Sequence, residues 1–105
     1  METTVPLITA DLARAARALA QVSLADVAHR AELDRERLRR FERGRGTLAA
    51  DENHDLRLAL EFFGVVFLPE DDEGGYGVRQ KFNRRKVVRL ENWENEGGPA
   101  YEDDI

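Results

Sequence analysis

The sequence of 105 residues predicts a mainly α-helical fold: a compact bundle of about five helices, with a short C-terminal β-hairpin and a final helix. Three observations support this prediction. Capping residues precede apolar residues at helical spacing at several points in the first half of the chain. Two of these helical segments are separated by only about three residues. The run VVFL has β-type composition, ends at a proline and is followed by an acidic loop that contains glycine.

The first helix is predicted to follow Thr9, whose hydroxyl is suited to accept a backbone hydrogen bond from the first turn. Asp11 places negative charge in that turn, where the helix dipole is positive. The apolar residues at helical spacing are Leu12, Ala15, Ala16 and Leu19. A second helix is predicted from Ser23 to about Ala31, with a buried side formed by Leu24, Val27 and Ala28.

Asp34 is the predicted cap of a third helix, which spans about residues 35–42 and ends at two glycines. The gap before Asp34 leaves room only for a tight turn, so the second and third helices have a helix-turn-helix layout. Leu38 and Phe41 are expected to face the core. The remaining positions make the outer face of this helix strongly basic.

A fourth helix is predicted at 51–63, with Leu56, Ala59, Leu60 and Phe63 on its apolar side. Two short strands over 65–79 are expected to form a hairpin that packs on helices or pairs with another chain. A final helix is predicted from about 84 to 93. The expected organisation is a helix-turn-helix domain at 9–64, a hairpin and helix extension at 65–95 as a candidate dimerisation element, and a flexible acidic tail at 96–105.

Acidic and basic residues are concentrated in different segments of the chain. The formal net charge is −5, yet residues 35–45 carry six arginines against two glutamates, which gives +4. Residues 79–89 carry six basic side chains and no acidic one, which gives +6. Basic segments attract phosphate locally, because salt screens interactions beyond about 10 Å. An acidic total therefore does not exclude a nucleic-acid partner.

Composition narrows the class of protein further. The chain has no cysteine, which excludes disulfides and thiolate metal sites. No apolar run approaches the roughly 20 residues that a membrane-spanning helix needs, and the N-terminus lacks the pattern of a signal peptide. We therefore expect a cytoplasmic protein without a cofactor or metal. His29 and His54 are isolated and lack ligand spacing. No catalytic triad or phosphate loop is recognisable, so we do not expect an enzyme.

Residues 13–44, ARAARALAQVSLADVAHRAELDRERLRRFERG, resemble the helix-turn-helix of lambdoid phage repressors and Cro, the Xre family. Residues 53–79 resemble the last helix and short β extension of a subgroup of small bacterial Xre-like regulators. The features that match the helix-turn-helix are Arg17, Ser23, DVAHRA at 26–31, Leu33, Asp34, Leu38 and FERG at 41–44.

The resemblance implies that the third helix enters the DNA major groove with its first residues at the base edges. The residues carried over as base contacts are Arg35, Glu36 and Arg40. Those carried over as contacts to the DNA backbone are Ser23, Arg37, Arg39, Arg43 and Arg45. An arginine presents two donors to guanine, and Glu36 either accepts from cytosine or orients a neighbouring arginine. A structural ion pair between Arg17 and Glu42 is also implied.

Three positions depart from the family pattern. Leu24 stands where relatives commonly have a glutamine that grips phosphate. Glu32 and Gln21 stand where glycine is common. If Glu32 keeps a left-handed conformation, it costs roughly 1 kcal/mol that glycine would avoid.

The expected function is a sequence-specific DNA-binding transcriptional regulator, a repressor that acts as a homodimer on an inverted repeat. The alternative is a protein-interaction module, similar to an antitoxin or anti-activator, that uses the helix-turn-helix as a scaffold. A solvated, purely structural helix explains the arginine-rich segment less well, because several arginines have like-charged neighbours at i,i+3 or i,i+4. For Arg84, Arg85 and Lys86, a second contact to DNA and internal pairing with the acidic segments both stay open.

Overall fold

The computed structural model describes residues 7–82, which form four helices followed by one antiparallel pair of strands. The helices are α1 (Ala10–Ala20), α2 (Leu24–Ala31), α3 (Arg35–Glu42) and α4 (Ala50–Phe62), and the strands are β1 (Val65–Leu68) and β2 (Gly77–Gln80). The prediction of a mainly helical fold with a short hairpin is confirmed. The predicted final helix and acidic tail lie outside the described residues.

Three of the helices begin at a side-chain cap, as the sequence predicts. The caps of α1, α2 and α3 accept backbone hydrogen bonds of 3.2, 3.0 and 3.0 Å, and they are Thr9, Ser23 and Asp34. α4 begins differently, because alanine precedes it. There the carboxylate of Glu52 accepts from the backbone N–H of Ala49 at 2.9 Å. Each helix therefore starts with a local acceptor for its free N–H groups.

Two helices end at residues in the left-handed conformation. α1 ends at Gln21 with φ 56°, and α2 ends at Glu32 with φ 58°. Their backbone N–H groups donate to carbonyls of the last helical turn. These ends turn the chain sharply, so that only three residues, 32–34, connect α2 to α3.

The core lies where the helices and the hairpin meet. Its largest fully buried side chains are Val27, Leu38, Leu56, Leu60 and Val65. The predicted apolar side of α1 is wrong at one position, because Ala15 is exposed and Ala13 is fully buried. The physical reason is that α1 packs between the other helices and β2, which moves its buried face toward Ala13.

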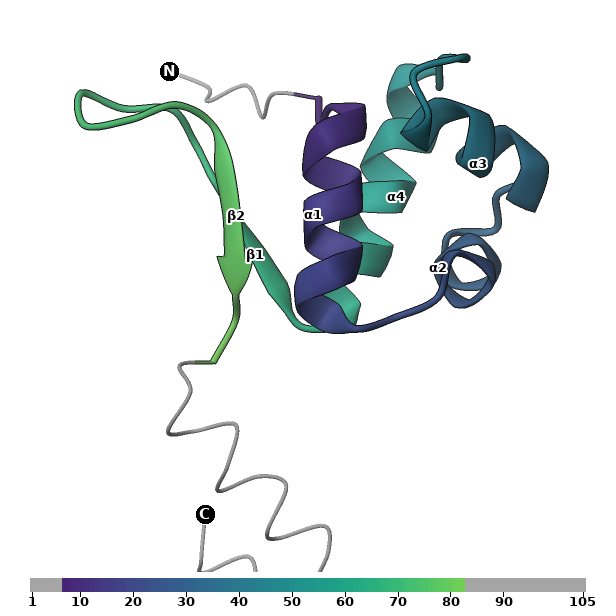
Figure 1. Cartoon of the computed structure of the whole chain (residues 1–105), viewed down its shortest axis with the longest axis horizontal. Coiled ribbons are helices and arrows are strands. Elements are labelled where there is room, and N and C mark those ends of the chain that lie inside the picture. Colours follow the sequence, from purple (N-terminus) through teal and green to yellow (C-terminus); the bar gives the residue numbers. More distant parts are fainter. Residues whose placement is uncertain (1–6, 83–105) are drawn as a thin grey trace, which may run out of the picture.

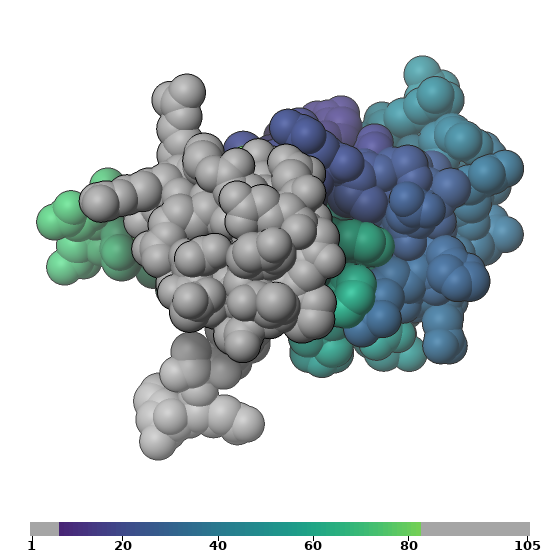
Figure 2. All heavy atoms as spheres, turned by 90° about the horizontal axis from the view of Figure 1, so that it is seen from below, coloured from purple at the N-terminus to yellow at the C-terminus, as the bar shows by residue number. Residues whose placement is uncertain are grey.

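The hairpin packs on helices of its own chain, one of the two arrangements expected for it. β1 and β2 pair from Val65 opposite Gln80 to Leu68 opposite Gly77. Val65 and Phe67 lie in the same core as the helices. The Gln80 amide donates to the carbonyl of Leu19 in α1 at 3.1 Å. The hairpin lies on the other side of α1 from α3 (Figure 1), and Figure 2 shows the green hairpin and the blue helices α2 and α3 at opposite ends of the molecule.

Candidate nucleic-acid interface

The C-terminal end of α3 is joined to α1 by a two-pronged ion pair. Arg17 Nε donates to Glu42 Oε2 and Arg17 Nη2 donates to Glu42 Oε1, both at 2.9 Å. The Glu42 side chain is 5% exposed and the Arg17 side chain 27%. A further guanidinium nitrogen of Arg17 donates to the carbonyl of Val22, at 3.2 Å. The ion pair that the family resemblance implies is therefore present, and it fixes the distance between α1 and α3.

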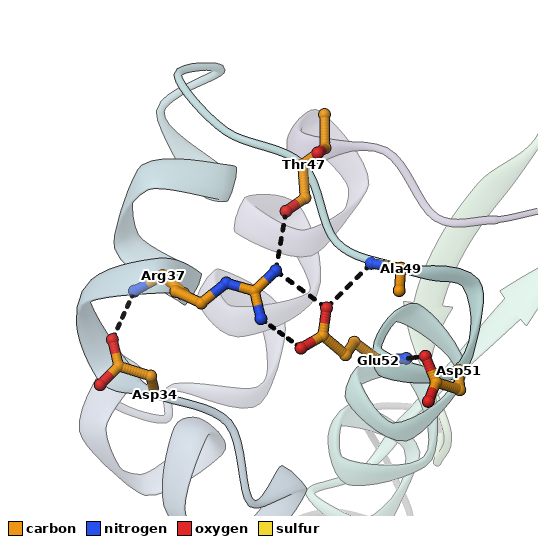
Figure 3. Close-up of polar contacts among 6 residues, drawn as sticks. All are labelled: Asp34, Arg37, Thr47, Ala49, Asp51 and Glu52. Carbon is orange, nitrogen blue, oxygen red and sulfur yellow. Dashed lines mark hydrogen bonds and ion pairs between the residues drawn. The ribbon is translucent and has the colours of Figure 1, made fainter.

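The N-terminal half of α3 is joined to the start of α4 by a second pair (Figure 3). The Arg37 guanidinium donates to both carboxylate oxygens of Glu52, at 2.9 Å for the Nη2–Oε1 contact, and to the carbonyl of Thr47 at 3.3 Å. The hydrogen bonds from Arg37 and from the backbone N–H of Ala49 hold the pKa of Glu52 below its usual value. The same contact raises the pKa of Arg37.

Arg37 therefore has an ion-pair partner in its own chain. The family resemblance implies that Arg37 contacts the DNA backbone, and the structure turns its guanidinium toward α4 and engages two of its nitrogens there (Figure 3). The reason is that Glu52 lies in the first turn of α4, beside α3, although it is 15 residues away in the chain. Half of the Arg37 side chain stays exposed, so the contact leaves donors at the surface.

Glu36 and Arg39 form a pair on the surface of α3. Arg39 Nη1 donates to Glu36 Oε1 at 2.6 Å, and the two residues are three positions apart on one face. This contact matches one of the two roles expected for Glu36, in which it orients a neighbouring arginine. Its second carboxylate oxygen has no partner among the described residues and is free to accept from a ligand.

Four arginines of the segment have no acidic partner within residues 7–82. They belong to the outer face of α3 or to the loop beyond its C-terminal end, and all four are exposed: Arg35, Arg40, Arg43 and Arg45. The loop is held against α3, because the backbone N–H of Arg45 donates to the carbonyl of Arg40 at 2.8 Å. Gly44 takes the left-handed conformation, with φ 74°, that this turn requires. The structure thus gathers unpaired positive charge along one side of α3.

Ser23 has a structural role at the N-terminus of α2. Its hydroxyl accepts from the backbone N–H of Asp26 at 3.0 Å. The next residue, Leu24, packs partly against the core and offers no side-chain donor. Arg84, Arg85 and Lys86 lie outside the described residues, so the structure places none of them.

No candidate metal site is found among the described residues. They contain no group of three or more His, Asp or Glu side chains positioned for a metal ion. His29 and His54 are exposed on separate helices. Among residues 7–82, no helix has the length and apolar character needed to cross a bilayer.

Asn53 is a buried polar residue whose partner none of the sequence motifs described above predicts. It is 4% exposed, and its amide exchanges two hydrogen bonds with the backbone of Ile8, of 3.0 and 2.9 Å. This contact ties the segment before α1 to α4. A signal for it exists in the sequence, because Asn53 is a polar residue in helical register with Leu56 and Leu60 on an apolar stripe.

Comparison of the chain with protein-family models and with curated proteins finds no match.

Proposed function

We propose that this protein is a sequence-specific DNA-binding transcriptional regulator of the helix-turn-helix type, which acts as a homodimer on an inverted-repeat operator and represses by occluding a promoter. The main observation behind the proposal is the way in which α3 is held in the fold and the charge that its outer side exposes. Both halves of this helix are tied to neighbouring helices, while its outer side keeps exposed arginines that have no acidic partner among residues 7–82. A rigid helix with unpaired arginines on one face is suited to the major groove of DNA.

Base recognition is assigned to the outward residues of α3. Arg35 lies in its first turn and Arg40 about one turn and a half further on, so both can reach neighbouring base pairs from one helix. Each guanidinium offers the two donors that fit guanine O6 and N7. Glu36 accepts from cytosine or holds Arg39 in place. Arg43 and Arg45 extend the positive surface toward the DNA backbone.

A dimer places two recognition helices about 34 Å apart, one turn of B-DNA. The candidate dimer surface is the hairpin and the segment that follows it, residues 65–95. This choice is supported by the position of the hairpin across α1 from α3, because pairing there leaves α3 uncovered (Figure 1). Mass measurement in solution at several protein concentrations tests the oligomeric state.

The direct test of the function is selection of bound duplexes from random DNA at two salt concentrations. An enriched palindrome that binds less tightly at the higher salt is the expected result, because phosphate contacts release counterions. Absence of any enrichment at low salt would sink the proposal.

Substitutions that reverse the charge of single arginines then test whether the outer face of α3 contacts the DNA. Arg35→Glu and Arg40→Glu are expected to abolish binding to the enriched duplex while leaving the helical circular dichroism spectrum unchanged. The matched control is Arg30→Glu, which makes the same change of charge in the last turn of α2, outside both α3 and residues 65–95. Binding lost equally in all three variants would point to a general charge effect rather than to a reading helix.

The second candidate function is a protein-interaction module that uses the same fold as a scaffold. Its specific support is the pair Leu58 and Phe62, two large apolar side chains exposed four residues apart on α4. A module of this kind predicts that Arg35→Glu and Arg40→Glu leave cellular function unchanged, whereas Leu58→Ser removes it. The regulator predicts the opposite pattern.

A further inference from the structure

The exposed face of α4 carries two large apolar side chains, Leu58 and Phe62, which are 49% and 60% exposed. They are four residues apart and therefore lie on one side of the helix. A pocket of about 420 Å³ adjoins this face between the end of α2 and α4, and its lining residues are Arg30, Ala31, Glu32, Asp55, Leu58 and Ala59. We propose that this face of α4 is the docking site of residues 84–93 of the same chain, with Trp93 in the pocket.

Phe62 offers apolar surface to such a partner. The guanidinium carbon of Arg30 lies 3.5 Å from the centre of its ring, so a cation covers one face of the ring. The ring of Phe63 contacts it edge-on, with the ring centres 5.2 Å apart. The Phe62 side chain nevertheless stays 60% exposed. An apolar segment that packs on Phe62 and Leu58 would remove this surface from water, which is favourable.

The chain leaves the described part of the structure beside this face. The backbone N–H of Lys81 donates to the carbonyl of Gly64 at 2.8 Å, and Gly64 is two residues beyond Phe62, the last residue of α4. Residues 83–105 follow, and they lie outside the described residues. A segment that begins there has a high local concentration at α4 of its own chain. This tether favours docking within one chain over docking onto a second copy.

The composition of the segment suits an apolar face. Val87, Leu90 and Trp93 are spaced by three residues, so they share one side of the helix that the sequence predicts over 84–93. Aromatic side chains bury roughly 150–250 Å² each when they pack. Trp93 is therefore the main apolar contribution of the segment.

The length of the segment fits the distance to the pocket. Phe62 and Asp55 are seven residues apart in α4, which corresponds to about 10 Å along the helix axis. The residues 84–93 span about 15 Å as a helix. A helix that starts beside Gly64 and runs antiparallel to α4 would therefore pass Phe62 and bring its last turn to the pocket at Asp55.

The charges at the C-terminal end of α4 also match the start of the segment. The last turn of α4 contains no basic residue, so nothing in that turn compensates the negative end of the helix dipole. Arg84, Arg85 and Lys86 open the segment. In the antiparallel arrangement they would lie beside this end of α4, where positive charge is stabilising.

The inference goes beyond the proposed function and does not depend on it. Docking would cover Leu58 and Phe62, on which the protein-interaction alternative rests, so a partner protein would have to displace the segment. The hairpin would remain the candidate dimer surface.

The test uses the fluorescence of the full chain, which contains a single tryptophan, Trp93. We expect emission at a shorter wavelength than in the urea-unfolded chain, and severalfold weaker quenching by acrylamide. Leu58→Ser should shift the emission toward that of the unfolded chain and strengthen the quenching. The matched control is Leu7→Ser, which changes an apolar side chain of similar exposure, 56%, before α1 and should alter neither measurement. Circular dichroism checks that each variant keeps its helices.

A disulfide tests the contact directly, because the chain has no cysteine of its own. The double variant Leu58→Cys, Leu90→Cys should form a disulfide within one chain on mild oxidation, since docking brings the two positions together. The control pair Leu7→Cys, Leu90→Cys should stay reduced. A reduced Leu58→Cys, Leu90→Cys chain together with a cross-linked control would contradict the proposal.

Three fluorescence results would overturn the proposal. Emission of the full chain that equals that of the unfolded chain would show that Trp93 docks on no surface. Emission at a shorter wavelength that Leu58→Ser leaves unchanged would place Trp93 elsewhere. The third comes from mixing the Leu58→Ser chain with an excess of the Trp93→Ala chain, which has an intact α4 and no tryptophan. Restored emission at the shorter wavelength would identify α4 of a second copy as the docking site.

Discussion

The two halves of α3 are joined to neighbouring helices by the same kind of contact in two different environments. Near its C-terminal end, the Arg17–Glu42 pair lies at the junction with α1, and the Glu42 side chain is 5% exposed. Near its N-terminal end, the Arg37–Glu52 pair joins α4, and its side chains are 49% and 23% exposed. Both carboxylates accept two guanidinium hydrogen bonds. The two pairs differ mainly in their access to water.

This difference indicates which pair the fold depends on. An exposed pair is screened by water and salt, and either partner can be solvated when the other is removed. A buried carboxylate that loses its partner has no such replacement, so its loss is strongly destabilising. We therefore expect Arg17–Glu42 to determine stability and Arg37–Glu52 to adjust the position of α3.

The largest expected effect comes from breaking the buried pair. Glu42→Gln should lower the free energy of unfolding by about 3 kcal/mol, the lower end for such pairs, because Arg17 is partly exposed. Urea unfolding followed by circular dichroism measures it. The double variant Arg17→Met, Glu42→Leu leaves no charge stranded, so it should recover much of the loss. A change below about 1 kcal/mol for Glu42→Gln would mean that this pair contributes no more to the free energy of unfolding than an exposed pair does. The expected difference between Arg17–Glu42 and Arg37–Glu52 would then be absent.

The second largest effect is expected on DNA binding. It compares an arginine of α3 that has no acidic partner among the described residues with one that forms an ion pair. Arg40→Gln should weaken binding of the enriched duplex by about 1–3 kcal/mol, roughly fivefold to 150-fold, and relax specificity at one base pair. Its thermal unfolding should match the wild type, because Arg40 has no acidic partner among the described residues. Arg37→Gln is the matched control and should weaken binding less, since its guanidinium already contacts Glu52. The reverse order would mean that the α4 contact opens when DNA binds.

A substitution at the turn before α3 tests how much a left-handed backbone conformation costs in stability. Glu32 has φ 58°, so Glu32→Gly should raise the free energy of unfolding by about 1 kcal/mol. Glu32→Ala keeps the Cβ atom and should bring no comparable gain. The measurement is again urea unfolding. Equal effects of the two substitutions would show that side-chain charge, rather than backbone conformation, sets stability at this turn.

The smallest expected effect is that of Glu52→Gln at neutral pH, where the exposed pair contributes little compared with Arg17–Glu42. The pH dependence of the stability tests this ion pair more directly than a measurement at neutral pH. The pKa of Glu52 is lower in the folded chain than in the unfolded one, because Arg37 and the N–H of Ala49 stabilise its charged form. The stability that it contributes is thus present above its unfolded pKa of about 4.3 and is lost as the pH falls below that value.

Melting temperatures between about pH 5 and pH 3 should therefore fall more steeply for the wild type than for Glu52→Gln. Parallel curves would show that Glu52 has the same pKa in both states, and so would contradict the contact with Arg37. High salt should reduce the difference between the two proteins, as expected for an exposed pair.

Much of the local structure can be predicted from the sequence. The caps Thr9, Ser23 and Asp34 lie at the starts of α1, α2 and α3, because a cap acts on N–H groups within its own first turn. The strand VVFL is predicted with its observed bounds. The family pattern has glycine at the position of Glu32, and Glu32 adopts the left-handed backbone conformation in the structure.

The contacts between elements are less accessible to sequence reasoning. Arg37 and Glu52 are 15 residues apart, and Asn53 meets Ile8 across 45 residues. No periodicity links such positions. The pair Arg17–Glu42, 25 residues apart, was implied only by a family resemblance.

The sequence by itself thus determined the four described helices, their ends and the concentration of arginines on α3, because these depend on residues within one or two turns of each other. Tertiary structure decided which arginines have partners. Arg37 pairs with α4 and Arg17 with α3, whereas Arg35, Arg40, Arg43 and Arg45 keep their charge exposed. The physical reason is that an ion pair forms only where packing brings two side chains within about 4 Å, and packing is set by the shared core rather than by any one segment.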